Sequence, residues 1–313
     1  MTARLDSLPA GEAPAFMSVR QVARYLQLNE KKIYALLKAG EIPGTKITGK
    51  WLFPRELIDR WVLDSAHGGL MQDRLLVCGG DDPLLYRVFL ELTHFHAARA
   101  LISYCPGGTR LGLDLLQNGR ADASALHWGP EQESGTRHPA LMKGYPKHRQ
   151  WILLRLFQRE TGVLLAPDLA ASDIQLESLL PCARNPSPLR WCLRPQGSGS
   201  QRFLEEALGH HVSLRELTAL PEPAASEREA ASRIASGVAD CAPGCRASAS
   251  EFNLGFLPLG IEAFDLVLPN GIYFRKLFQQ LLEQLQSPAT ARLARQLGGY
   301  DLSRCGQIIW SGS

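Results

Sequence analysis

The stretch from Met17 to Trp61 constrains the fold more than any other part of the chain, because it sets two short helices close together. Ser18 is a candidate N-cap, with a glutamine three residues later as its capping-box partner. Asn29 is a second candidate N-cap, and it opens a helix predicted over Glu30–Ala39. Gly40 is predicted to end that helix. The short turn before Asn29 has the spacing of a helix-turn-helix motif.

The residues that follow predict a β-hairpin and a third helix. Lys46-Ile47 and Lys50 to Phe53 are candidate strands, and Gly49 between them allows the positive φ that a tight turn requires. Pro54 is expected at the first position of the last helix. Two helices followed by such a hairpin make a winged helix-turn-helix.

This segment resembles the excisionase-like, MerR-related winged helix-turn-helix module. The matching residues are Ser18 to Ala23, Ile33 to Gly40, Ile42-Pro43, Lys46-Ile47, Gly49 to Trp51 and Phe53-Pro54. The resemblance implies a domain over residues 17–64 whose partner is double-stranded DNA.

The charge of this segment agrees with a DNA-binding role. Residues 17–64 hold nine Lys and Arg against five Asp and Glu, whereas the whole chain has a formal net charge of only +3. Such an excess on the second helix and the wing is what phosphate neutralisation requires. The alternative is a solvated basic face on a small protein-binding winged helix. The candidate DNA-binding residues are Arg20, Asn29, Lys31, Lys32, Tyr34, Lys38, Lys46, Thr48 and Lys50.

The ends of this segment are typical of unstructured chain. Residues 1–16 contain Pro, Gly and Ala without periodicity, which predicts a disordered tail and not a secretory signal. Residues 65–73 contain Gly68-Gly69 and predict a linker. No stretch is long and apolar enough to span a bilayer, so we expect a cytoplasmic protein without a membrane partner.

From Arg74 onward the pattern changes to alternating strands and helices, which is typical of a parallel α/β unit. Candidate strands lie at 75–78, 100–104, 121–126, 151–157, 162–166, 189–193, 238–241, 255–259 and 265–268. Candidate helices begin at Pro83 and lie at 111–117, 201–208, 229–236, 273–286 and 288–296. Such sheets bind ligands beyond the carboxyl ends of their strands.

Two glycine-hydroxyl loops precede helices in this region, at Gly107-Gly108-Thr109 and at Gly197 to Ser200. A helix N-terminus offers unpaired N–H groups and a partial positive charge, and glycine lets an anion approach the backbone closely. Neither loop has the Lys-Ser/Thr ending of a Walker motif. Ordinary helix capping is the alternative interpretation of each.

The region from Arg74 to Asn270 resembles the periplasmic-binding-protein-like domain that is fused to helix-turn-helix modules in bacterial regulators. The matches are Asp82-Pro83, Gly108-Thr109, Gly112-Leu113, Gly119 to Asp122, His127, Arg194, Gly197 to Arg202, Ser236 to Asp240 and Phe264 to Val267. The resemblance implies a two-lobed type II fold over residues 74–313 that closes on a small-molecule ligand. The family is associated with molybdate, tungstate or molybdenum-cofactor pathways.

One loop departs from that family's pattern. The first loop commonly reads Ser-His-Asp, whereas here it is Gly80-Asp81-Asp82, and Glu227 stands where relatives tend to have Thr-His. Carboxylates facing a cleft would repel an oxyanion, which leaves room for a zwitterionic, cationic or larger organic ligand, or for a degenerate site. The candidate ligand-binding residues are Asp81, Asp82, Gly107, Gly108, Thr109, His127, Arg194, Gly197, Ser198, Gly199, Ser200 and Ser226.

The seven cysteines are scattered, and only Cys241 and Cys245 lie close in sequence. Without a second pair at zinc-site spacing, buried reduced thiols are the expected interpretation, with redox sensing by this pair as the alternative. The sequence predicts no metal, no cofactor and no catalytic motif.

The predicted fold class is α/β, with an N-terminal winged helix-turn-helix and a two-lobed periplasmic-binding-protein-like type II domain. The predicted function is a ligand-responsive transcriptional regulator that acts as a homodimer. An enzyme or small-molecule carrier of oxyanion or molybdenum-cofactor metabolism is the alternative. A helical stripe near the C-terminus could serve dimerisation or pack on the second lobe: Leu277, Phe278, Leu281, Leu282 and Leu285.

Overall fold

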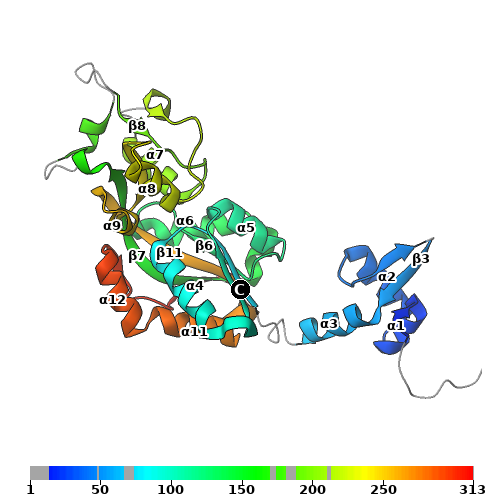
Figure 1. The fold of residues 1–313 in the computed structure, drawn as a ribbon. Coiled ribbons are helices and arrows are strands. Elements are labelled where there is room, and N and C mark those ends of the chain that lie inside the picture. The colour runs from blue at the N-terminus through cyan, green and yellow to red at the C-terminus, as the bar shows by residue number, and fades with distance from the viewer. Residues whose placement is uncertain are drawn as a thin grey trace, which may run out of the picture. The chain divides into compact units, whose positions relative to one another are not determined.

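The computed structural model describes residues 14–47, 49–66, 74–169, 174–180, 188–209 and 213–312. They belong to two compact units, residues 1–72 and 73–313 (Figure 1). Thr48, most of the predicted tail and most of the predicted linker lie outside the described residues. Among the described residues, no helix has the length and apolar character needed to cross a membrane.

The N-terminal unit is a winged helix-turn-helix. Its elements are β1 (Phe16–Met17), α1 (Val19–Tyr25), α2 (Glu30–Ala39), β2 (Thr45–Ile47), β3 (Lys50–Pro54) and α3 (Arg55–Ala66), with strand order β1-β3-β2. Ser18 makes both hydrogen bonds of the predicted capping box, and the Asn29 side chain accepts the Lys32 N–H at 2.7 Å. Gly40 ends α2 at φ 69°. These local signals therefore form the helices where the sequence predicts them.

The structure corrects two predicted boundaries in this unit. Phe16 and Met17 pair with Pro54 and Phe53, so a strand begins at the end of the predicted tail. Pro54 ends β3, and α3 begins one residue later. The small core contains side chains with no exposed surface, among them Met17, Val22, Ile33, Phe53 and Ile58.

The C-terminal unit is built on a ten-stranded sheet with central order β5-β4-β6-β11-β7-β10-β8-β9. Its strands are β4 (Arg74–Gly79), β5 (Leu101–Cys105), β6 (Ala123–Leu126), β7 (Trp151–Leu165), β8 (Arg190–Trp191), β9 (Thr218–Ala219), β10 (Cys241–Cys245), β11 (Gly255–Pro269), β12 (Tyr300–Asp301) and β13 (Ile308–Ser311). Its α-helices are α4 (Pro83–His96), α5 (Thr109–Gln117), α6 (Ser134–Met142), α7 (Gly199–Leu208), α8 (Glu227–Ala235), α9 (Arg246–Glu251), α10 (Asn270–Tyr273), α11 (Lys276–Leu285) and α12 (Pro288–Leu297).

Two long antiparallel strands, β7 and β11, connect two lobes (Figure 1). The first lobe is built on β4, β5 and β6, and the second on β8, β9 and β10. The sequence predicted four short strands here, because charged residues such as Arg159 and Glu160 interrupt the apolar runs. That prediction is wrong, since Arg159 is buried and paired inside the sheet.

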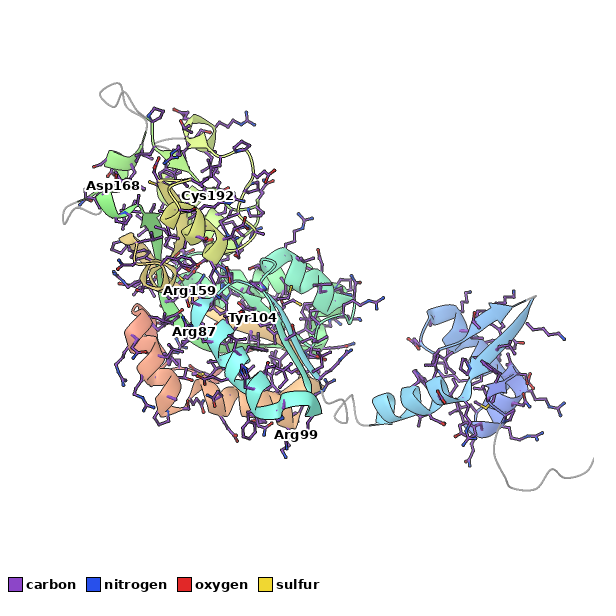
Figure 2. The ribbon with its side chains drawn as sticks, in the orientation of Figure 1. Arg87, Arg99, Tyr104, Arg159, Asp168 and Cys192 are labelled. Carbon is purple, nitrogen blue, oxygen red and sulfur yellow. The ribbon has the colours of Figure 1, made fainter. Side chains whose placement is uncertain are left out.

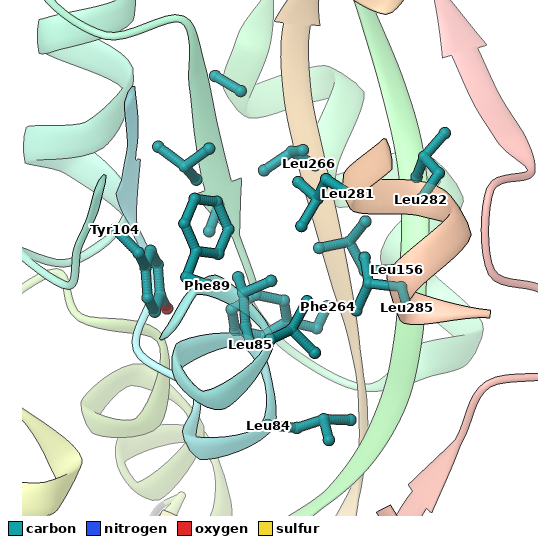
Figure 3. Close-up of a cluster of buried hydrophobic side chains, with 14 of the residues drawn as sticks. Leu84, Leu85, Phe89, Tyr104, Leu156, Phe264, Leu266, Leu281, Leu282 and Leu285 are labelled. Atoms are coloured by element: carbon teal, nitrogen blue, oxygen red, sulfur yellow. The ribbon is translucent and has the colours of Figure 1, made fainter. Parts of the chain in front are cut away.

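Two further predictions are corrected in this unit. The strand predicted at 238–241 lies at Cys241–Cys245, so the two close cysteines sit on one buried strand. The α11 stripe does not pack on the second lobe: Phe278, Leu281 and Leu285 belong to the core of the first lobe, together with Phe89 of α4 (Figure 3). Being buried, that stripe is not a free dimer surface.

Candidate functional site

The candidate DNA-binding residues of α2 lie on the solvent side of the helix. Lys31, Lys32, Tyr34 and Lys38 are exposed, whereas Ile33 faces the core. The other described candidates, Arg20 on α1, Asn29 before α2, and Lys46 and Lys50 on the wing, are exposed as well. The Asn29 oxygen is already engaged in capping α2. The basic groups are therefore available to a partner on this surface.

A cavity of about 250 Å³ lies between the N-terminus of α5 in the first lobe and the loop before α7 in the second. Five of the candidate ligand-binding residues line it: Gly107, Gly108, Arg194, Gly197 and Ser198. The remaining lining residues are Arg110, Leu111, Asp114, Pro195, Gln196 and Ala225. The structure thus brings the two glycine loops together at one site.

The polar groups of this cavity are only partly satisfied. Arg194 is 4% exposed, and its Nη1 donates to the Ala224 carbonyl at 2.6 Å. Among the described residues, neither its Nε nor the buried Ser198 hydroxyl has a hydrogen-bond partner. Ser198 and Gly108 are the N-caps of α7 and α5, and neither helix start has a side-chain cap. Two open helix N-termini and a buried guanidinium suit a negatively charged group.

Deeper between the lobes lies a buried charge network centred on Arg159 of β7, which the sequence reasoning missed (Figure 2). Its Nη1 lies 3.0 Å from an Asp82 oxygen, and its Nη2 lies 3.0 Å from a Glu227 oxygen and 2.8 Å from a Glu262 oxygen. These carboxylates come from the first lobe, the second lobe and the connecting strand β11. One arginine therefore links all parts of the unit.

The carboxylates of the first loop belong to this network and do not line the cavity. Asp82 caps α4 by accepting the Leu85 N–H at 2.8 Å, and Asp81 accepts the N–H of Glu227. The repulsion of an oxyanion expected from the sequence is reduced, because both groups have buried partners. Burial alone would raise the pKa of Glu262, but His127 and Arg159 lower that pKa to about 2.

The other candidate ligand-binding residues are used in packing. The His127 ring stacks on Phe264 and lies 3.1 Å from a Glu262 oxygen. A Cβ on Gly199 would come within 2.2 Å of the His127 ring, so only glycine lets α7 approach it. Thr109 donates to the His127 carbonyl, and Ser226 caps α8. The buried Ser200 hydroxyl has no hydrogen-bond partner among the described residues. None of these side chains lines the cavity.

The two lobes also contact each other through α7 of the second lobe and the side chains of Trp128 and Arg137. Glu206 of α7 accepts hydrogen bonds from Arg137 at 2.6 Å and from the Trp128 indole at 3.2 Å. Arg202, also on α7, lies over the Trp128 ring at 4.9 Å from its centroid. With the Arg159 network, this contact shows that the described lobes are closed on each other.

Protonation of Asp81, which lies in this network, makes the free energy of unfolding depend on pH. Burial, and then the neighbouring Glu227 carboxylate, raises the pKa of Asp81 to about 6. Between about pH 4 and 6 the folded state therefore binds more protons than the unfolded state, and the free energy of unfolding falls as pH rises. We expect Asp81→Asn to stabilise the protein at pH 8 by about 1–3 kcal/mol, with less effect at pH 5.

Urea unfolding of the two proteins at pH 5 and pH 8 measures this difference. Asp240→Asn is the matched control, because the pKa of Asp240 is lowered by hydrogen bonds from Arg190, and its loss should destabilise at pH 8. An Asp81→Asn protein less stable than the parent at pH 8 would contradict the prediction.

Comparison with known families gives two matches. Residues 91–286 match a model described as the PBP superfamily domain, and residues 16–65 match one described as a helix-turn-helix domain. These matches support both halves of the resemblance drawn from the sequence, while its molybdate-regulator part stays a prediction. No curated protein matches the chain.

Solved structures with a similar fold include an OxyR protein and a putative transporter substrate-binding protein. An H2O2-bound cysteine-to-serine mutant of Corynebacterium glutamicum OxyR has 16% identity and a TM-score of 0.50, covering 90% of this chain and 89% of that one. A putative phosphate ABC transporter substrate-binding protein from Clostridium perfringens, with bound phosphate, has 9% identity and a TM-score of 0.50, covering 72% of this chain and 97% of that one. At such identities the likeness establishes the fold alone.

Proposed function

Because this chain belongs to the PBP superfamily and carries a helix-turn-helix domain, we propose that it is a transcriptional regulator whose affinity for DNA responds to a small molecule. The observation that carries the proposal is the presence, in one chain, of an exposed basic helix α2 and a cavity between two closed lobes.

The DNA-binding step uses the exposed face of α2. Lys31, Lys32 and Tyr34 enter the major groove, while Lys46 and Lys50 of the wing contact phosphates. One winged helix makes a small interface, so two copies bind a repeated site as a homodimer. The excess of nine basic over five acidic residues in the whole segment 17–64 supports DNA contact by this unit.

The ligand is a small organic molecule that carries a carboxylate or phosphate group. The anionic group sits at the N-termini of α5 and α7, where Arg194 and Ser198 have unused donors. The cavity, at about 250 Å³, approaches the ~300 Å³ at which small-molecule pockets begin. Asp114 in the same wall favours a zwitterion over a simple oxyanion.

Ligand binding acts on lobe closure. The cavity has walls from both lobes, so a ligand that contacts both binds the closed form more tightly than the open form. The ligand can change the affinity for DNA only to the extent that its own affinities for the closed and open forms differ.

Thermal unfolding tests the cavity. A ligand at a hundred times its Kd stabilises by about 2.7 kcal/mol, which raises the Tm of a unit of this size by roughly 5–10 °C. We expect one or more small organic carboxylates or phosphorylated metabolites to do so, and a smaller shift from inorganic phosphate, molybdate and tungstate, because Asp114 lines the same cavity. Arg194→Ala and Ser198→Ala should each reduce that shift at least by half.

Arg215→Ala is the matched control, because Arg215 is exposed and does not line the cavity. A stabilising compound whose shift is the same in the Arg194→Ala, Ser198→Ala and Arg215→Ala proteins would place its site elsewhere. Chemical turnover of that compound would favour the alternative of an enzyme.

A further inference from the structure

Two cysteines that are distant in sequence lie side by side in the sheet. Cys78 of β4 and Cys105 of β5 are register partners on neighbouring parallel strands. Side chains of such partners point to the same face, and neighbouring strands lie about 4.8 Å apart. That separation falls within the ~4.4–6.8 Å between Cα atoms that a disulfide spans. Both cysteines are free thiols in the structure.

The pair suggested by sequence spacing does not meet this condition. Cys241 and Cys245 are the two ends of β10, and a strand rises about 3.3 Å per residue, which puts them roughly 13 Å apart. Both are buried, whereas Cys105 is exposed and Cys78 is half-buried. Of these two pairs, Cys78 with Cys105 is therefore the one fit for intramolecular oxidation.

The position of this pair connects it to the cavity. Cys78 lies near the end of β4, directly before Gly79 and the loop that contains Asp81. Cys105 ends β5, two residues before Gly107 in the cavity wall. Directly beyond the two thiols, the Gly108 N–H donates to the Gly79 carbonyl at 2.7 Å. A covalent link between the strands at this point would restrain both loops.

We propose that Cys78 and Cys105 form a dithiol site that a hydroperoxide oxidises to a disulfide. The Cys105 thiol loses its proton, and the thiolate attacks the hydroxyl oxygen of the peroxide. The O–O bond breaks, a sulfenic acid forms, and the hydroxide or alkoxide that leaves takes up that proton as water or an alcohol. The Cys78 sulfur then attacks the sulfenic sulfur, the S–O bond breaks, and water leaves with the Cys78 proton. Two thiols thus give two electrons to one peroxide.

The environment sets the order of the two steps. Cys105 is on β5, at the edge of the sheet, where a peroxide can reach it. Burial, and then the neighbouring Cys105, raises the pKa of Cys78 to about 11, so Cys78 is the poorer first nucleophile and acts second.

Treatment of the full-length protein with hydrogen peroxide, followed by alkylation and mass spectrometry of the unreduced digest, tests the site. We expect the number of free thiols to fall by two, with one peptide pair joined through Cys78 and Cys105, and to return to its starting value with dithiothreitol. In Cys78→Ser, a dimedone adduct should accumulate on Cys105. In Cys105→Ser, no disulfide at Cys78 should form.

Cys305→Ser is the matched control, and it should still form the Cys78–Cys105 link. An unchanged thiol count, or a disulfide that joins other cysteines or two chains, would overturn the proposal. The proposal does not depend on the regulator function, because the readout is the bond itself and requires neither DNA nor a cavity ligand.

Discussion

Replacing Arg159 with methionine is expected to lower the free energy of unfolding of the C-terminal unit by about 3–5 kcal/mol, the usual cost of leaving buried charges unpaired. Asp82, Glu227 and Glu262 are at most 1% exposed, and all three lie within 3.0 Å of the Arg159 guanidinium. Without it, carboxylates from both lobes repel each other in a region that water does not reach. Urea unfolding followed by circular dichroism measures the loss.

Two comparisons separate the network from a general effect of losing an arginine. Arg87→Ala removes the exposed guanidinium from its ion pair with the buried Glu251 carboxylate, which keeps Arg228 as a partner, and should cost about 1 kcal/mol or less. Adding Glu227→Gln and Glu262→Gln to Arg159→Met removes two of the unpaired charges and should restore part of the stability. A loss from Arg159→Met no larger than that from Arg87→Ala would show that the network does not hold the lobes together.

Replacing Lys31 and Lys32 together with alanine is expected to weaken binding to the protein's own promoter DNA at least tenfold. Both side chains are exposed at the start of α2, where a recognition helix approaches the duplex. Each lost phosphate contact lowers the slope of log K against log salt by about 0.9, so the slope should fall by about 2. Fluorescence anisotropy at several salt concentrations gives both quantities.

The control for this experiment is Lys143→Ala/Lys147→Ala, which removes two exposed lysines from the C-terminal unit. It has the same change in net charge and should leave both the affinity and the slope near those of the parent. Equal binding by the Lys31→Ala/Lys32→Ala protein and the parent would exclude the proposed docking face. Because both lysines are exposed, thermal unfolding of the two proteins should agree.

The sequence predicted the N-terminal unit almost residue by residue, because its signals are local. The Ser18 capping box, the Asn29 cap and the Gly40 stop each act within one helical turn. Pro83 likewise starts α4, whereas α5 and α7 begin at Thr109 and Gly199, two residues before the starts predicted from the sequence. The match of each part to a known family agrees with that interpretation.

The sequence predicted only part of the arrangement of residues around the cavity. Both glycine loops reach the cavity, yet Asp81, Asp82 and His127 are drawn into the Arg159 network or the packing around it. Arg159 gave no usable signal, because a charged residue within an apolar run indicates a strand end when only its neighbours are known. The contact between Trp128 and Glu206 could not be predicted from the sequence either, because 78 residues separate the two side chains.

The amino-acid sequence by itself determined the caps of α1 and α2, the wing and most of the longer helices, since these depend on residues a few positions apart, but it did not predict α6 or α9. Tertiary structure alone decided which charges are paired, which glycines face a cavity and which cysteines are neighbours. Cys78 meets Cys105, and Arg159 meets Glu262, only because the sheet sets distant strands in register. Burial makes these contacts important for stability, because a charge removed from water is destabilising unless a partner compensates it. Burial also changes the pKa of a thiol.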